Sequence, residues 1–131
     1  MRFMIMVKAD ADYEAGKPPT PELIEAIGKL GQREFSTGRM VEMGGLLPTS
    51  AGGRVRAARG RVRVTDGPFT EAKEVVGGYA VVEVTSRQEA LEMAREFMQA
   101  HIDVLGDAYE GECEVRQLAF EPPPDVARGA A

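Results

Sequence analysis

Acidic and basic side chains crowd around one tight turn in the stretch VTDGPFTEAKEVVGGY, residues 64–79. Asp66 stands directly before Gly67-Pro68, and a rigid turn at a strand end holds a carboxylate still enough for general acid or base work. Glu71 and Lys73 follow closely and share a face if this segment is extended. We therefore take Asp66 as a candidate acid/base or its orienter, and Lys73 as a candidate electrostatic stabiliser.

The same turn also has a purely structural interpretation. Asp66 can bond the backbone amides of its own turn, Gly67 can supply a dihedral that only glycine favours, and Pro68 can fix the next one. A surface ion pair is the corresponding interpretation of the charges that follow. Both interpretations stay open, and candidate ligand contacts on the functional one are Gly67, Pro68, Phe69, Glu71, Tyr79 and Arg63.

His101 is the single histidine of the chain, so any imidazole general base must be this residue. We expect it at or just past the end of the second long helix, beside Asp103 and Asp107. There it either interacts with the helix dipole or shuttles protons as a partner of Asp66. The spacing of these three residues matches no familiar metal motif, so no metal site is predicted.

Five arginines make residues 54–63 the most charge-dense stretch. A solvated hairpin, whose charges also discourage pairing at its edges, is the simplest interpretation. The alternative is docking of an anionic small molecule or of an acidic partner. Nucleic acid is not expected as a partner, because aromatic residues are not interleaved and the chain carries a net charge of −5.

Bulk properties fit one globular domain of 131 residues. Cys113 is the single cysteine and lies between two acids, which makes it a poor nucleophile. The N-terminus is too short for a secretory signal, and the apolar runs are too short to cross a membrane, so a cytoplasmic protein is predicted. The glycine motifs of nucleotide sites are absent, and we expect no cofactor.

Periodicity predicts alternating strands and helices. Residues 2–8 form a strand that is apolar on both faces. Thr20 and Ser86 each begin a helix as its N-cap, the first helix ending at Gly38 and the second before residue 100. Gly28 and Gly31 suggest close approach of the first helix to the sheet. The remaining strands are expected at residues 40–47, 78–84 and 112–120, with a hairpin at 54–65.

This order predicts an α+β domain at residues 1–120, with a Pro-rich tail at 121–131 that we expect to be disordered. The antiparallel sheet carries two helices on one face. Because the first strand is apolar on both faces, the other face also needs a cover. A homodimer that packs sheet against sheet, with a cleft for a small molecule near its seam, is the simplest solution. A long loop folded back over the sheet is the alternative.

The stretch from Val64 to Tyr79 resembles the DGPF signature of the YCII-related (DGPF domain) family. The opening MRFMIMVKAD, the segment GGLLPTS at 44–50 and the segment EGECEVR at 110–116 are also similar to that family. The resemblance implies a ferredoxin-like two-layer sandwich assembled as a dimer with facing sheets, a dimeric α/β-barrel-like assembly. Some relatives in the wider group are enzymes with a His-Asp pair, whose histidine lies early in the chain. Residues 7–13 contain no histidine here, so that pair is not carried over.

Three functions follow as hypotheses. The first is an enzyme without organic cofactor that performs acid/base chemistry, such as elimination or isomerisation, on a small anionic or aromatic molecule. The second is a non-catalytic ligand-binding or regulatory module that uses the same cleft. The third is a structural dimer in which the DGPF turn only organises the fold.

Overall fold

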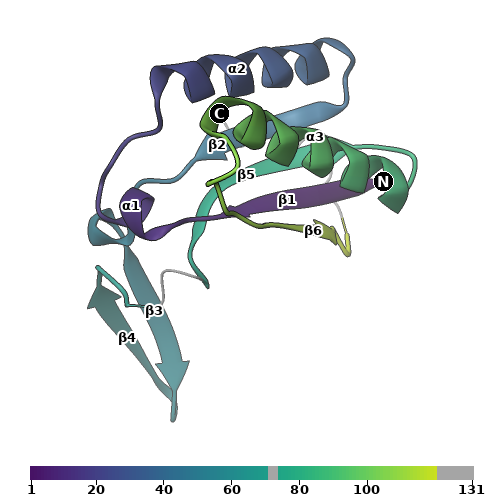
Figure 1. Cartoon of the computed structure of the whole chain (residues 1–131). Coiled ribbons are helices and arrows are strands. Elements are labelled where there is room, and N and C mark those ends of the chain that lie inside the picture. The colour runs from purple at the N-terminus through teal and green to yellow at the C-terminus, as the bar shows by residue number, and fades with distance from the viewer. Residues whose placement is uncertain (71–73, 121–131) are drawn as a thin grey trace.

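A four-stranded antiparallel sheet forms the centre of the computed structural model, which describes residues 1–70 and 74–120. Its strands follow the order β2-β5-β1-β6, with bounds Met40–Gly45, Val76–Glu83, Arg2–Lys8 and Cys113–Gln117. Helices α2 (Pro21–Ser36) and α3 (Arg87–Leu105) cover one face of this sheet (Figure 1). The predicted α+β class is confirmed, and the order of strands and helices is compatible with a ferredoxin-like fold.

The hydrophobic core lies between the sheet and α3. In β1, Phe3 and Ile5 point toward the helices and are 3% and 5% exposed. They pack with Val82, which is fully buried, and with Met93 of α3. This alternation of side chains along a strand is what fixes the register of β1 against its neighbours.

Capping residues begin and end the long helices. The Thr20 hydroxyl accepts a hydrogen bond from the Leu23 amide at 3.3 Å, and the Ser86 hydroxyl accepts one from the Glu89 amide at 3.1 Å. Gly38 has a positive φ of 79° just past α2, as a helix-ending glycine does. The predicted helix starts and the end of α2 are thus confirmed.

The predicted end of the second long helix was wrong. α3 continues to Leu105, because residues 100–105 contain no glycine or proline, and Gly106 with a φ of 86° is the first residue to break it. His101 therefore lies inside the helix. Between β1 and α2 lies a short helix, α1 (Ala11–Glu14), and a 3-10 turn, η1, spans Thr49–Ala51. The C-terminal tail lies outside the described residues.

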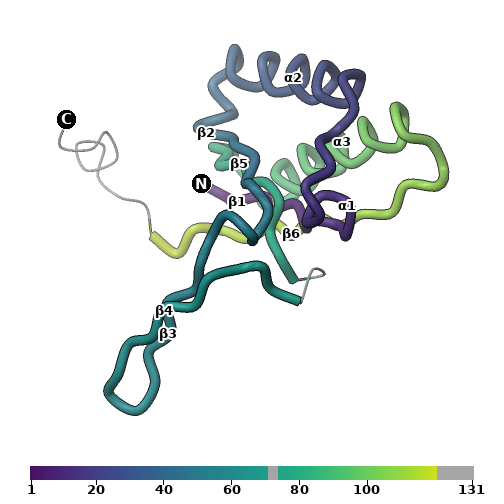
Figure 2. Tube along the Cα trace, turned by 90° about the vertical axis from the view of Figure 1, so that its left-hand side faces the viewer, coloured from purple at the N-terminus to yellow at the C-terminus, as the bar shows by residue number. Residues whose placement is uncertain are grey.

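The arginine-rich hairpin is present but separate from the main sheet. β3 (Gly53–Ala58) and β4 (Arg61–Asp66) pair only with each other. Arg59 and Gly60, with φ of 54° and 75°, form the two-residue turn, and two positive φ values are typical of a tight hairpin turn. Figure 2 shows this hairpin extending away from the body of the molecule.

No helix of residues 1–70 or 74–120 covers the second face of the four-stranded sheet. Because Phe3 and Ile5 face the helices, Met4 and Met6 project from the opposite side, beside their cross-strand partners Val81 and Tyr79. We call the surface formed by Met4, Met6, Tyr79 and Val81 the open face. All four side chains are half-buried in the single chain.

Candidate functional site

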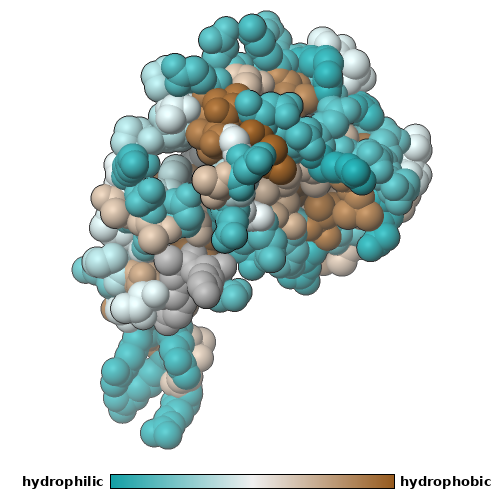
Figure 3. All heavy atoms as spheres, viewed as in Figure 1, coloured by the Kyte–Doolittle hydropathy of each residue, from teal (hydrophilic) through white to brown (hydrophobic). Residues whose placement is uncertain are grey.

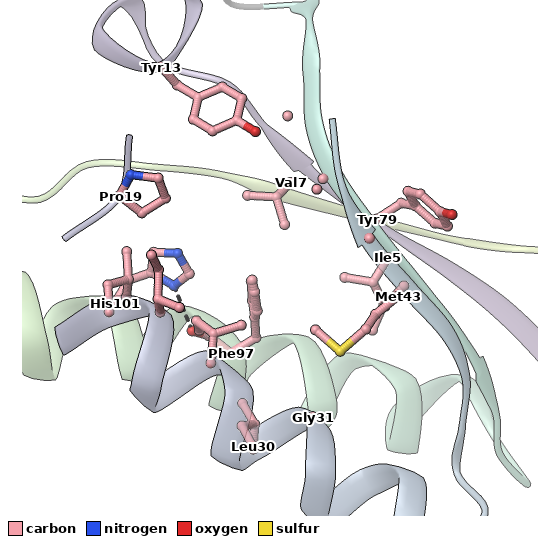
Figure 4. Close-up of a pocket in the computed structure, with 18 of the residues that line it drawn as sticks. Ile5, Val7, Tyr13, Pro19, Leu30, Gly31, Met43, Tyr79, Phe97 and His101 are labelled. Atoms are coloured by element: carbon pink, nitrogen blue, oxygen red, sulfur yellow. Dashed lines mark hydrogen bonds between the residues drawn. The ribbon is translucent and has the colours of Figure 1, made fainter. Parts of the chain in front are cut away.

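A cavity of about 650 Å³ lies between the helix-covered face of the sheet and helices α2 and α3. Figure 4 shows side chains from β1, β2, α2 and α3 pointing into it. The space-filling view shows apolar side chains gathered at the surface between α2 and α3 (Figure 3). Most of the large side chains around the cavity are apolar: Ile5, Val7, Leu23, Ile27, Leu30, Met40, Met43, Met93, Phe97 and Leu105.

His101 supplies the imidazole of this cavity and is only 8% exposed. Its Nδ1 lies 2.9 Å from the Phe97 carbonyl oxygen, one turn earlier in α3. A carbonyl oxygen only accepts hydrogen bonds, so Nδ1 carries a proton, and in the neutral form of the ring Nε2 is the nitrogen with the lone pair. No hydrogen bond joins Nε2 to another of the described residues. Nε2 is therefore an acceptor available to a bound molecule.

Two aromatic rings hold the His101 ring in place. Phe97 lies at 4.7 Å between ring centroids, and Tyr109 is stacked at 5.1 Å. Burial raises the pKa of the Tyr109 phenol, so this hydroxyl stays protonated at neutral pH. A Cβ added to Gly111 would lie 2.0 Å from the Tyr109 hydroxyl oxygen, so a glycine is needed there to admit the ring.

A buried carboxylate lies near the C-terminal end of α2. Glu34 lines the cavity, is 4% exposed and accepts hydrogen bonds from Arg39, whose Nη2 lies 2.6 Å from its Oε2. Arg39 also reaches Glu89 of α3 at 3.3 Å. This network ties α2 to α3, and its arginine satisfies the carboxylate that would otherwise be costly to bury. We interpret it as structural support for the cavity wall.

The DGPF turn packs against η1. A Cβ on Gly67 would lie 1.7 Å from the Thr49 carbonyl oxygen, so close approach of two backbones requires glycine. The expected special dihedral was wrong, since Gly67 is not among the glycines with positive φ. The Phe69 amide donates to the Thr49 hydroxyl at 3.0 Å. Asp66 is exposed at the end of β4, beside Gly53.

Glu14 of α1 completes this connection. Its carboxylate accepts a hydrogen bond from the Thr49 amide at 2.8 Å and another from the Thr49 hydroxyl. The hydroxyl bond, and then the amide bond, lower the pKa of Glu14 below its ordinary value. The DGPF turn is thus linked through Thr49 to α1, whose Tyr13 lines the cavity.

The other predicted site residues fall in different places. Tyr79 donates to Glu42 at 3.1 Å, and that bond and the Glu42 charge raise the pKa of its phenol. Its ring points away from the cavity in Figure 4, although the residue contributes to the lining. Phe69 lies under the Arg54 guanidinium at 3.8 Å. Arg63 is exposed on the hairpin, while Glu71 and Lys73 lie outside the described residues.

Among the predicted site residues that the structure describes, His101 and Tyr79 line the cavity. Asp66, Gly67, Pro68, Phe69 and Arg63 do not belong to its lining. Sequence reasoning missed the aromatic partners of His101. The spacing of four between Phe97 and His101 was the available signal, since such residues are neighbours on a helix. Tyr109 gave no comparable signal, because it follows α3 in a loop, where sequence spacing does not predict its contact with the His101 ring.

Other chemistry has less support. Burial, and then the nearby Glu112 charge, raise the pKa of the Cys113 thiol to about 11, which makes it a poor nucleophile. Across residues 1–70 and 74–120, no three His, Cys, Asp or Glu side chains gather closely enough to hold a metal ion.

Within the same residues, no helix combines the length and apolar character that crossing a membrane requires.

Comparisons with known proteins agree on one family. The model of the YCII-related domain matches residues 1–105. A protein from Rhizobium meliloti (strain 1021), described as uncharacterized, is 33% identical over 110 residues, and the alignment covers 84% of each chain.

Proposed function

The chain belongs to the YCII-related domain family, and we propose that it binds a small, mostly apolar molecule in the cavity between the sheet, α2 and α3. The His101 Nε2 atom accepts a hydrogen bond or a proton from that molecule. A cavity of about 650 Å³ with a mostly apolar surface is typical of small-molecule sites. The proposed ligand site thus lies on the helix-covered face, whereas the sequence predicted a cleft near a seam of facing sheets.

The single observation that carries this proposal is the Nε2 atom of His101, to which none of the described residues donates a hydrogen bond. Nε2 is not a buried atom left without a partner, so it faces space that water or a ligand can reach. A ligand that presents an O–H or N–H group can donate to it there. The aromatic rings of Phe97 and Tyr109 beside it favour a weakly acidic aromatic molecule, such as a phenol.

Acid/base catalysis is the further step in this proposal. A neutral imidazole held by its Nδ1–H bond can remove a proton from a bound molecule and return it to another atom, as an isomerisation or elimination requires. This chemistry needs no organic cofactor. The DGPF turn takes the structural role of linking the hairpin to η1, supported by its contacts with Thr49. Asp66 does not line the cavity, so a substitution of Asp66 serves as the control for a substitution of His101.

Binding of a panel of substituted phenols, measured by calorimetry, tests this function. A His101→Phe variant keeps an aromatic ring at this position but loses the Nε2 acceptor. We expect its affinity for phenols to fall about tenfold, because one neutral hydrogen bond is lost. An Asp66→Asn variant should bind like the parent protein. Equal affinity of the His101→Phe variant, or the absence of binding by every phenol, would contradict the proposal.

A homodimer with the open faces turned toward each other completes the proposed assembly. The row of Met4, Met6, Tyr79 and Val81 is apolar apart from one phenol, and a partner sheet would remove it from water. Sedimentation equilibrium tests this, with Val81→Lys as the disrupting variant. A monomer for the parent protein, or a dimer unaffected by Val81→Lys, would contradict the facing-sheet arrangement.

A further inference from the structure

The β3–β4 hairpin has two chemically different faces. Cross-strand pairing places Val55 opposite Val64 and Ala57 opposite Val62, so these four side chains share one face. We call this the valine face. Arg54, Arg56, Arg61 and Arg63 lie on the other face. Figure 3 shows that the surface of the hairpin, at the bottom of the view, is mostly hydrophilic. The three valines are 69% to 72% exposed.

So much exposed apolar surface on a two-stranded sheet requires an explanation. An isolated hairpin is marginally stable in water, and a hairpin with one apolar face normally packs it on something. The body of the same chain does not cover the valine face, since each residue from Gly53 to Asp66 is exposed. Among the described residues, the valine face is therefore open to a second molecule.

The position of the hairpin indicates which molecule. Figures 1 and 2, seen from directions 90° apart, both place it on the side of the sheet away from α2 and α3. It therefore projects past the plane of the open face. A second copy that packs on the open face would meet this hairpin.

Charge complementarity supports the same occupant. The hairpin contains five of the 16 basic residues of the chain, while Asp66 is its one acid out of 21. The open face has an acid at the β2 edge of its sheet, where Glu42 pairs with Val81 and is exposed. At the β6 edge, Glu114 already lies within 4 Å of Lys8 and Arg116. A basic, partly apolar hairpin matches an apolar surface with an acidic β2 edge.

We propose that the β3–β4 hairpin is a dimerisation arm, which packs its valine face at the β2 edge of the open face of a second copy of this chain, beside Glu42. This inference rests on the proposed homodimer and assigns the arm a part of the interface. In a two-fold assembly each arm would contact the other subunit in the same way.

Sedimentation equilibrium of the parent protein, Val62→Asp, Val64→Asp and Gln32→Asp tests the arm. Each substitution adds one acid at an exposed position, and Gln32 lies on α2, on the far side of the sheet. We expect the dimer dissociation constant to rise at least tenfold for both valine variants and to stay unchanged for Gln32→Asp. A dimer that the valine variants leave intact would overturn the arm but not the homodimer. A parent protein that is monomeric would overturn both.

Cross-linking provides a second readout, which locates the surface that the arm contacts. A photo-reactive phenylalanine analogue replaces Val62, and equal amounts of ¹⁴N- and ¹⁵N-labelled chains are mixed before irradiation. We expect cross-links between light and heavy chains, located by mass spectrometry in peptides that contain β1, β2, β5 or β6. Cross-links confined to single chains, or located on α2 or α3 of the second copy, would overturn the proposal.

Discussion

The Nδ1 atom of His101 lies 2.9 Å from the carbonyl oxygen of Phe97, and this one contact determines which nitrogen of the ring can act. Because the carbonyl accepts the Nδ1 proton, Nε2 is the basic atom. The stacked ring of Tyr109 limits rotation of the imidazole. The sequence alone placed His101 beside an acidic loop, whereas the structure places it in an apolar cavity.

Replacing Gly67 by alanine should destabilise the protein. The new Cβ would lie 1.7 Å from the Thr49 carbonyl oxygen, and neither backbone yields without breaking the bond from Phe69 to Thr49. We expect a loss of about 1–3 kcal/mol in the free energy of unfolding, as for other overpacked sites. Urea denaturation measures it. A Gly67→Ala variant as stable as the parent would contradict the close packing of the turn on η1.

Gly28→Ala is the opposite case and should stabilise the protein. Gly28 lies inside α2, and a Cβ there would meet no other atom within 4 Å. Alanine is the better helix former, so we expect a gain of about 0.5–1 kcal/mol in the same urea assay. A loss of stability would show that α2 packs more tightly at this point than the structure indicates.

Acidification should weaken the contact between Glu14 and Thr49. The folded-state pKa of Glu14 is lowered from 4.5, so its contribution to stability is fully present above that pH and is lost as the pH falls through the folded-state pKa. A Glu14→Gln variant should melt at a lower temperature than the parent at pH 7, and the difference should shrink below about pH 4. A difference that is independent of pH would contradict this assignment.

Patterns within single elements made most of the fold predictable. Thr20, Ser86 and Gly38 act as the caps that their neighbours indicated, and the alternation of Phe3 and Ile5 with Met4 and Met6 gave both faces of β1. These signals are local, because capping and periodicity depend on residues a few positions apart. The helix end at Leu105 was missed because Asp103 and Asp107 suggested an acidic loop, although Ile102 and Leu105 are apolar.

The candidate site was less predictable because it depends on contacts between distant segments. The glycines show this clearly. Both Gly28 and Gly31 suggested close approach to the sheet, yet only Gly31 meets a side chain, with the Met43 sulfur 2.6 Å from where its Cβ would be. Gly67 is glycine because of Thr49, which lies 18 positions earlier. The motif that drew attention by its residue types is explained by packing, while the cavity residue His101 lacked any motif.

Nitrogen-15 NMR of the imidazole tests the central claim most directly, since the chain contains a single histidine and so gives one pair of ring signals. We predict a protonated Nδ1 and, on titration with a phenol that binds, a shift confined mainly to Nε2. A ring protonated on Nε2, or an Nε2 signal that stays constant while phenol binds, would contradict the role of His101 as the acceptor in this cavity.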